Sequence, residues 1–144
     1  MDLSRYIPQY RQPRPDLITG GQPEPSAWPE LAKAGVNLVV NLRPTAEMPD
    51  RNEAEEVRSA GLTYINVPID GPDRLGRSQV ETLWRALESS PGLTLVHCGT
   101  GNRCGALLAL AEVWHRGSTP DAALAFGQSA GLSGLEPAVR SILA

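Results

Sequence analysis

The segment LTLVHCGTGNRCGALLALA, residues 93–111, decides the fold of this 144-residue chain. Residues 93–96 are mostly apolar and predict a buried strand, and the small and apolar residues 105–111 predict a buried helix. Between them stand Cys98, Gly99, Gly101 and Arg103. The glycines allow backbone N–H groups to turn inward, and the start of the helix adds positive charge. Because such surroundings favour the thiolate, the segment predicts an anion-binding loop with Cys98 as its nucleophile.

Strand and helix signals alternate along the rest of the chain. Strands are expected at 17–19, 36–42, 63–67 and 93–96, and helices at 26–34, 50–60, 78–89, 102–115, 119–129 and within 130–144. The pair Ser78 and Glu81 matches a capping box at the start of the 78–89 helix. The alternation predicts an α/β fold, a three-layer α-β-α sandwich with a mainly parallel sheet and the 93–96 strand near its centre. Such sheets bind ligands at the carboxyl ends of their strands, which is where Cys98 lies.

Composition and charge narrow the classes of partner. The chain has 13 Lys and Arg against 16 Asp and Glu, a net charge of −3, which argues against nonspecific binding to nucleic acid or to anionic membranes. It has no apolar run of membrane-spanning length and no apolar signal core near its start, so we expect a cytoplasmic protein. Residues 1–16, rich in Pro, Arg, Gln and Tyr, are expected to form an extended N-terminal arm. Such an arm could contact a second copy of the chain, so a homodimer stays an open alternative. Residues 17–144 are expected to form a single domain, for which the sequence suggests no cofactor.

The residues of the loop have different expected roles. Arg103 would clamp an anionic group, because an Arg at a helix start opposes the helix dipole and needs another reason to be there. His97 either holds the loop and lowers the pKa of Cys98 or is a core histidine with a satisfied ring. The loop residues expected to line the bound anion are Gly99, Thr100, Gly101 and Asn102, although Thr100 and Asn102 also fit ordinary turn chemistry.

Cys104 is the second of the two cysteines. It could form a reversible disulfide with Cys98, or it could be a small helix residue packed against the sheet. A metal site built from the cysteines and histidines is not expected, because His97 and Cys98 point to opposite faces of a strand and His115 lies three turns along the helix. The acidic run 53–56 is expected to be a solvated helix face near a helix start.

These residues and four further motifs resemble a known family. The motifs are Thr19-Gly20-Gly21-Gln22-Pro23, Val39-Val40-Asn41-Leu42-Arg43, Gly61-Leu62-Thr63-Tyr64 and Val67-Pro68-Ile69. The 97–103 loop resembles that of cysteine-dependent protein tyrosine and dual-specificity phosphatases, and residues 17–135 resemble bacterial phosphatase-like domains sometimes fused to β-lactamase-like hydrolases.

The resemblance implies a reaction and assigns roles in it. The implied reaction is hydrolysis of phosphomonoesters, phosphotyrosine-type esters among them, through a phosphocysteine on Cys98, with no metal. It places the general acid after the 67–69 strand, at Asp70 or Asp73, although both aspartates also fit turn chemistry. Arg43 would bind substrate or brace the loop, or would simply be a surface Arg before Pro44.

Two departures from the phosphatase pattern keep a second activity open. Four residues separate Cys98 from Arg103, whereas the phosphatase signature has five. Four is the length seen in rhodanese-type sulfurtransferases, whose cysteine carries a persulfide between a sulfur donor and an acceptor. Cys104 also stands where many phosphatases have Ser or Thr, and a thiol is the weaker hydrogen-bond donor.

Overall fold

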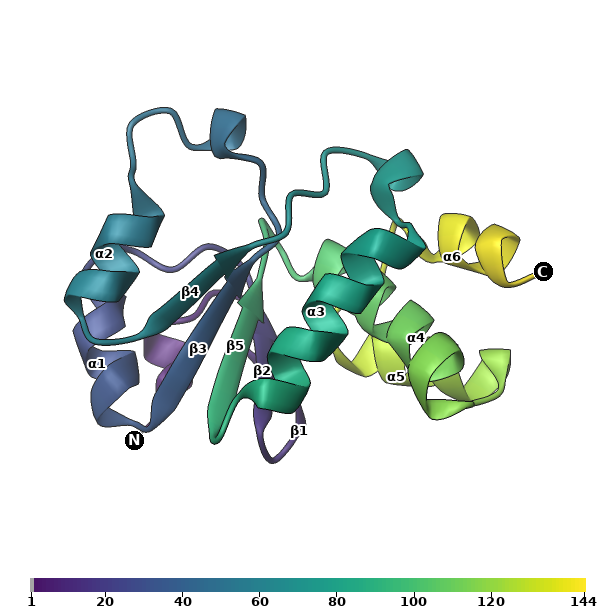
Figure 1. Ribbon diagram of the computed structural model, residues 1–144, viewed down its shortest axis with the longest axis horizontal. Helices are drawn as coiled ribbons and strands as arrows, with labels where there is room; N and C mark the ends of the chain where they lie inside the picture. The colour runs from purple at the N-terminus through teal and green to yellow at the C-terminus, as the bar shows by residue number, and fades with distance from the viewer. Residues whose placement is uncertain (1) are drawn as a thin grey trace.

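A five-stranded sheet forms the centre of the molecule in the computed structural model, which describes residues 2–144. The strands are β1 (Arg11–Arg14), β2 (Leu17–Gly20), β3 (Val36–Asn41), β4 (Thr63–Asn66) and β5 (Leu93–His97). Their order is β1-β2-β5-β3-β4, and only the pairing of β1 with β2 is antiparallel. The mainly parallel sheet and the central place of β5 are therefore confirmed (Figure 1).

Helices cover both faces of this sheet. On one face lie α1 (Ala27–Lys33) and α2 (Glu53–Ser59), and on the other lie α3 (Arg77–Ser89), α4 (Asn102–Arg116) and α5 (Pro120–Ser129), with α6 (Glu136–Leu143) packed on α4 and α5 (Figure 1). Short 3-10 turns occur at Leu3–Arg5, Thr45–Glu47 and Pro72–Arg74. The expected three-layer sandwich is confirmed.

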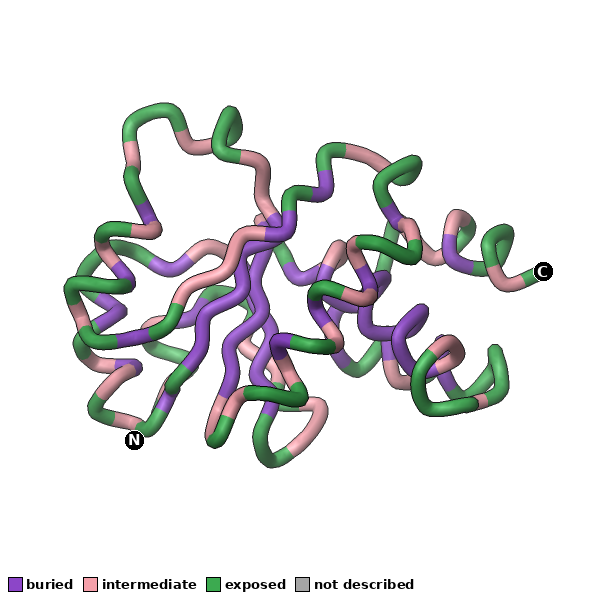
Figure 2. The backbone as a smooth tube through the Cα atoms, in the orientation of Figure 1, coloured by how far each residue is buried: buried purple, intermediate pink, exposed green. Residues whose placement is uncertain are grey.

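The alternation of side chains along β5 divides the interior into two cores. Leu95 belongs to the core beneath α1 and α2, and Val96 belongs to the core beneath α3 and α4. The three central strands β2, β3 and β5 are buried along most of their length, whereas the edge strands β1 and β4 are partly or fully exposed (Figure 2). The alternation continues past the strand end, so that His97 lies beside Trp28 on the first face and Cys98 joins the core of the second. Neighbours in sequence thus enter different surroundings.

Most of the expected helix ends are found, with one exception. Asn52 caps α2 through the N–H of Glu55, and Thr119 caps α5 through the N–H of Ala122. The capping box at 78–81 is wrong: α3 begins at Arg77 with Gly76 at its N-cap. Gly76 has the extended conformation usual for an N-cap residue (φ −117°, ψ 174°), so Ser78 lies inside the helix. Glu81 pairs with Arg85 on the next turn.

The N-terminal arm is also different from the expectation, because residues 2–16 belong to the domain. Ile7 is 1% exposed and packs in the core beneath α1 and α2. β1 extends the sheet by pairing Arg11 with Thr19 and Arg14 with Leu17. Arg14 then forms an ion pair with Glu112 of α4. Ile7, Arg11 and Arg14 therefore have partners within the same chain.

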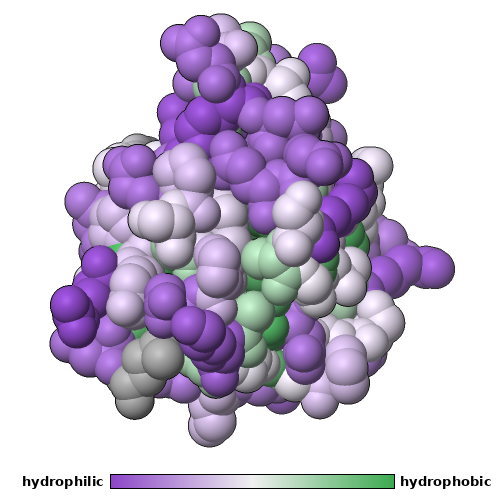
Figure 3. All heavy atoms as spheres, turned by 90° about the vertical axis from the view of Figure 1, so that its left-hand side faces the viewer, coloured by the Kyte–Doolittle hydropathy of each residue, from purple (hydrophilic) through white to green (hydrophobic). Residues whose placement is uncertain are grey.

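The surface on the α1 and α2 side is mostly hydrophilic, with only small apolar areas (Figure 3). Within residues 2–144, no helix combines the length and the apolar character needed to cross a lipid bilayer.

Candidate active site

Residues 98–103, which we call the nucleophile loop after the role predicted for Cys98, connect the carboxyl end of β5 to the first turn of α4. Cys98 N–H donates to the carbonyl of Gly20 at 3.2 Å, which fixes the loop to the end of β2. A side chain at Gly21 would meet the carbonyl oxygen of Gly99 at 2.7 Å, so the double glycine at 20–21 allows the two backbones to approach closely. Gly101 has φ 104°, a left-handed conformation that turns the chain into the helix.

The sulfur of Cys98 is surrounded by hydrogen-bond donors. Gly101 N–H donates to Cys98 Sγ at 3.0 Å, and Cys104 Sγ lies 3.7 Å from it. The Cys104 thiol is the main group that lowers the pKa of Cys98 to about 4, with help from the N–H groups of Cys104, Thr100 and Gly101 and against the opposing effect of burial. Burial raises the pKa of the Cys104 thiol. The pair therefore consists of a thiolate at Cys98 and a protonated thiol at Cys104 at neutral pH.

Arg103 lies over the loop with most of its donors engaged. Its Nη1 donates to Glu47 Oε2 at 2.9 Å and to the carbonyl of Ile69 at 3.0 Å, and its Nη2 donates to Glu47 Oε1 at 3.1 Å. A Cβ at Gly99 would be 3.4 Å from Nη2, which places the guanidinium beside the loop backbone. Burial by itself would lower the pKa of Arg103, but Glu47 and the negative charge of Cys98 raise it. Arg103 thus supplies a permanent positive charge next to the thiolate.

The segment that follows β3 supplies the acid that pairs with Arg103. Glu47 lies on the 3-10 turn Thr45–Glu47, and hydrogen bonds from Arg103 and Arg43 lower its pKa despite partial burial. Arg43 Nε donates to Glu47 Oε1 at 3.1 Å, and Arg43 Nη1 donates to Gln22 Oε1 at 2.9 Å. Arg43 therefore contacts Glu47 and Gln22, and within residues 2–144 it is connected to the nucleophile loop only through the pairing of Glu47 with Arg103.

His97 occupies a buried polar site on the opposite face. Its Nε2 lies 2.6 Å from Glu53 Oε2, and the other oxygen of Glu53 accepts from Gln22 Nε2 at 2.7 Å. His97 Nδ1 has no hydrogen-bond partner among residues 2–144. The expectation of a solvated face at 53–56 is wrong for Glu53, which is 4% exposed. The His97 ring thus lies on the side of the sheet away from the sulfur, where it contacts Glu53 and Trp28.

The other two polar residues of the loop differ in their surroundings. Thr100 is exposed, and its carbonyl accepts from Arg11 Nη1 at 3.4 Å. Asn102 Oδ1 accepts from the backbone N–H groups of Ser133 and Leu135 at 2.9 and 3.1 Å. The Asn102 side chain therefore ties the start of α4 to the 130–135 turn.

The two candidate acids lie on the segment after β4. Asp70 directly follows Ile69, whose carbonyl accepts from Arg103, but its carboxylate is 60% exposed and pairs with Arg74 Nε at 3.3 Å. Asp73 is exposed on the 3-10 turn Pro72–Arg74. Asp70 is thus adjacent in the chain to a residue of the site, with its side chain held by an exposed ion pair.

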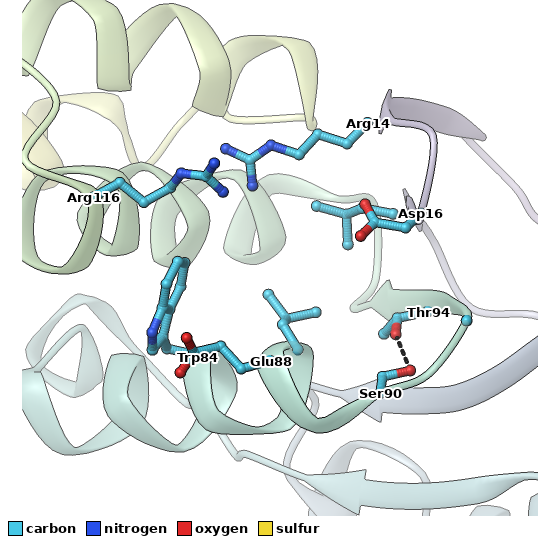
Figure 4. A pocket seen from close by; sticks show the side chains of 10 residues that line it. Arg14, Asp16, Trp84, Glu88, Ser90, Thr94 and Arg116 are labelled. Carbon is cyan, nitrogen blue, oxygen red and sulfur yellow. Dashed lines mark hydrogen bonds between the residues drawn. The ribbon is translucent and has the colours of Figure 1, made fainter.

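A cavity of about 610 Å³ lies at the far end of the sheet from the nucleophile loop. It is lined at the amino ends of β2 and β5 by Leu17 and Thr94, and Figure 4 shows the guanidinium groups of Arg14 and Arg116 facing each other beside Trp84. Cys98 follows the carboxyl end of β5, so this cavity is separate from the thiolate.

Sequence reasoning missed the supporting residues Gln22, Glu47 and Glu53. Gln22 lies in one of the motifs of the family resemblance, which is a signal that could have drawn attention to it. Glu47 and Glu53 carried no comparable signal, because each meets its partner only through the folded structure: Arg103 for Glu47 and His97 for Glu53.

Comparison with known proteins places this chain in a family. The sequence model of the beta-lactamase hydrolase-like protein, phosphatase-like domain, matches residues 9–114. The chain belongs to this phosphatase-like domain family. Two beta-lactamase hydrolase-like proteins, from Xylella fastidiosa strains Temecula1 and 9a5c, are each 37% identical to the phosphatase-like domain over 101 residues. That alignment covers 67% of this chain and 23% of each relative, so the chain spans about a quarter of their length.

Solved structures show the same fold. A candidate phosphatase (DUF442) from Shewanella putrefaciens CN-32 has a TM-score of 0.75 and 24% identity, covering 98% of this chain and 92% of that one. TpbA of P. aeruginosa has a TM-score of 0.73 and 21% identity, over 99% and 86% of the two chains. Human DUSP28 has a TM-score of 0.69 and 27% identity, over 94% and 90%. The phosphatase-like domain therefore has the fold of the cysteine phosphatases.

Proposed function

We propose that this domain is a cysteine-dependent phosphatase that hydrolyses phosphomonoesters through a phosphocysteine on Cys98. The observation that carries the proposal is the Cys98 sulfur, which receives the N–H of Gly101 at 3.0 Å and has a pKa of about 4. A thiolate held by inward N–H groups beside Arg103 has the charge and the donors that phosphoryl transfer requires. Membership of a phosphatase-like family supports the same reaction class.

The proposed reaction has two steps. In the first, Cys98 Sγ attacks phosphorus, the bond to the ester oxygen breaks, and that oxygen leaves with a proton from a general acid. In the second, water attacks the phosphocysteine and gives a proton to the carboxylate that acted as the acid, the S–P bond breaks, and inorganic phosphate and the Cys98 thiolate are released. Loop N–H groups and Arg103 stabilise the negative charge on the phosphoryl oxygens in both steps. The Cys104 thiol, 3.7 Å away, would stabilise the departing thiolate.

Asp70 and Asp73 are the proposed candidates for the general acid. Asp70 has the stronger case, because the residue before it already contacts Arg103 through its carbonyl. To act as the acid, its carboxyl group would leave Arg74 and turn toward the nucleophile loop. The pair with Arg74 is exposed and therefore costs little to break.

The depth of the sulfur favours aryl phosphates over short alkyl phosphates as substrates. Cys98 is 1% exposed, so a phosphoryl group must be carried down to it. A phosphotyrosine-type ring holds its phosphate farther from the peptide backbone than a phosphoserine side chain does. Of the structural relatives, TpbA has been crystallised in complex with phosphotyrosine. A free thiolate nucleophile also fits a reducing compartment such as the cytoplasm.

Phosphate release from p-nitrophenyl phosphate by the reduced protein tests this function, with Cys98→Ser as the control. The proposal predicts turnover that depends on Cys98. If the folded, reduced protein releases no phosphate but transfers sulfur from thiosulfate to cyanide, the loop with four intervening residues serves sulfur transfer and the proposal is wrong.

A further inference from the structure

Arg11 lies beside the nucleophile loop, although it belongs to the edge strand β1. Its Nη1 donates to the carbonyl of Thr100 at 3.4 Å and to the carbonyl of Gln9 at 3.0 Å. A Cβ at Gly101 would stand 2.9 Å from the same nitrogen. Because the backbone nitrogen of Gly101 lies 3.0 Å from the Cys98 sulfur, ordinary bond lengths place Arg11 Nη1 within about 9 Å of that sulfur.

The charge of Arg11 has no partner of opposite sign in the part of the chain that the structure describes. Arg103 is paired with Glu47, whereas no carboxylate of residues 2–144 forms an ion pair with Arg11, which is only partly exposed. Nη1 directs its two N–H groups to backbone carbonyls, and the Nε and Nη2 groups donate to no atom of the same residues. Nε–H and one N–H of Nη2 share an edge of the guanidinium, which fits two oxygens of a carboxylate or a phosphoryl group.

The turn ahead of β1 fixes Arg11 in this place. Gln9 has φ 49°, a left-handed conformation that is strained for a residue with a side chain. The turn is fixed to the domain on both sides, because Ile7 is buried in the core and the carbonyl of Pro8 accepts from Gly21 N–H at 2.7 Å. The strained residue directs its own carbonyl to Arg11. Strain of this kind is concentrated at functional sites, where the surrounding structure maintains it.

We propose that Arg11 is a specificity-determining residue, whose free guanidinium edge binds a second anionic group of a substrate that has its phosphoryl group at Cys98. The phosphoryl group rests on the proposed function, whereas the anion site at Arg11 does not. The substrate class is then phosphomonoesters that carry a second phosphate or a carboxylate near the first phosphoryl group. Such a group would supply the counter-charge that residues 2–144 do not give to Arg11.

Protection of Cys98 from alkylation by iodoacetamide measures this binding without any phosphatase activity. An oxyanion bound at the nucleophile loop covers the sulfur, so the alkylation rate falls as the site fills and gives a dissociation constant. The probes are inorganic phosphate, which reaches the loop alone, and inorganic triphosphate, which carries further anionic groups toward Arg11. In Arg11→Gln the dissociation constant is expected to rise about three- to tenfold for triphosphate and less than about twofold for phosphate.

The substitutions separate the charge of Arg11 from its contact with the loop. Glutamine removes the charge but keeps an amide that can donate to the carbonyls of Thr100 and Gln9. Arg11→Lys keeps the charge without the planar fork and is expected to weaken triphosphate binding less than Arg11→Gln does. Arg85→Gln is the matched control, because Arg85 is an exposed arginine on α3, and it should leave both dissociation constants unchanged.

Two pairs of substrates distinguish the sources of the second anionic group. Phosphotyrosine peptides that differ only in Glu or Gln beside the phosphotyrosine test a carboxylate, and a sugar bisphosphate with its monophosphate tests a second phosphate. The expected result is a higher kcat/KM for the more anionic member of at least one pair, which Arg11→Gln abolishes. Equal values within both pairs in the wild type would overturn the specificity role.

The anion-binding outcomes are distinct from failure of the proposed function. An equal rise for phosphate and triphosphate in Arg11→Gln would show that Arg11 only shapes the loop, and it would overturn the inference. Triphosphate that protects wild-type Cys98 no better than phosphate, or an equal loss in Arg85→Gln, would overturn it as well. If the wild type releases no phosphate from p-nitrophenyl phosphate but Arg11→Gln selectively weakens triphosphate binding, the function fails and the anion site stands.

Discussion

Cys98 and His97 are neighbours in the chain, yet they lie in opposite surroundings. Cys98 points into the apolar core beneath α4, where a thiol and backbone N–H groups surround its sulfur. His97 points to the other face of the sheet, where it meets the buried carboxylate of Glu53. The groups that lower the pKa of Cys98 most are on its own side, and Cys104 leads them. The groups that lower the pKa of Cys98 thus lie on one face of the sheet, and the buried His97–Glu53 pair lies on the other.

Substitution of the two neighbours should produce very different losses. Cys98→Ser is expected to lower the rate of phosphate release by about a thousandfold or more, because the alkoxide is far harder to form than the thiolate. His97→Asn is expected to cost about tenfold or less, because an amide can still bond to Glu53. Steady-state kinetics with p-nitrophenyl phosphate measures both. Equal losses in the two variants would mean that His97 takes part in the chemistry.

The acid after β4 should matter only for some substrates. Asp70→Asn is expected to lower the rate of hydrolysis of phosphate esters with poor leaving groups, such as alkyl phosphates, by about ten- to a hundredfold. The effect on p-nitrophenyl phosphate should be smaller, because p-nitrophenolate leaves readily without a proton. Asp73→Asn is the matched variant on the same segment. A comparison of rates across leaving groups checks this. An unchanged rate for poor leaving groups would remove Asp70 from the acid role.

The pKa of Cys98 should depend on Cys104. The thiol pKa is lowered from 9.0 to about 4, so the unfolded chain binds the Cys98 proton between these pH values and the folded chain does not. The thiolate therefore adds stability as pH rises through this window and loses it as pH falls toward 4. Cys104→Ala is expected to move the midpoint of Cys98 alkylation by iodoacetamide to higher pH. Cys104→Ser, which keeps a donor, should move it less, and an unmoved midpoint in Cys104→Ala would contradict the role of the thiol.

On the His97 side, the expected change is in stability more than in rate. Glu53→Ala leaves His97 buried without its partner and is expected to lower the free energy of unfolding by about 3 kcal/mol. Among the variants described, Glu53→Ala should change the rate of phosphate release per folded molecule the least. Urea unfolding monitored by tryptophan fluorescence gives the value, with the exposed Glu55→Ala as the control. A loss below that of the control would show that the buried pair is not a support.

The sequence was sufficient to predict the layers of the fold because local patterns specify them. Apolar strands and amphipathic helices alternate, and strand periodicity alone places His97 and Cys98 on opposite faces. The capping box was wrong because α3 begins at Arg77, which places Ser78 inside the helix instead of at its N-cap. The prediction of an arm was wrong because the many prolines of residues 1–16 indicated an extended surface segment, and the single buried Ile7 and the short edge strand β1 gave no clear pattern.

The site was predicted where its residues are contiguous and missed where they are not. Cys98 and Arg103 lie in one loop whose composition indicates anion binding. Glu53 stands in the first turn of a helix, where acids are common on the surface, and nothing local distinguishes a buried acid from an exposed one. Glu47 lies on a polar loop and reaches Arg103 only through the fold. Contacts across tens of residues depend on the tertiary structure, which a single sequence does not show.

Detection of a phosphorylated Cys98 during turnover decides whether the reaction passes through a phosphocysteine. The reduced enzyme is mixed with a radiolabelled aryl phosphate, quenched rapidly, and digested to identify the labelled peptide. A phosphocysteine mechanism predicts label on the peptide that contains Cys98, with none in Cys98→Ser. Phosphate release in the absence of any label on Cys98, or with label on another residue, would contradict the phosphocysteine mechanism.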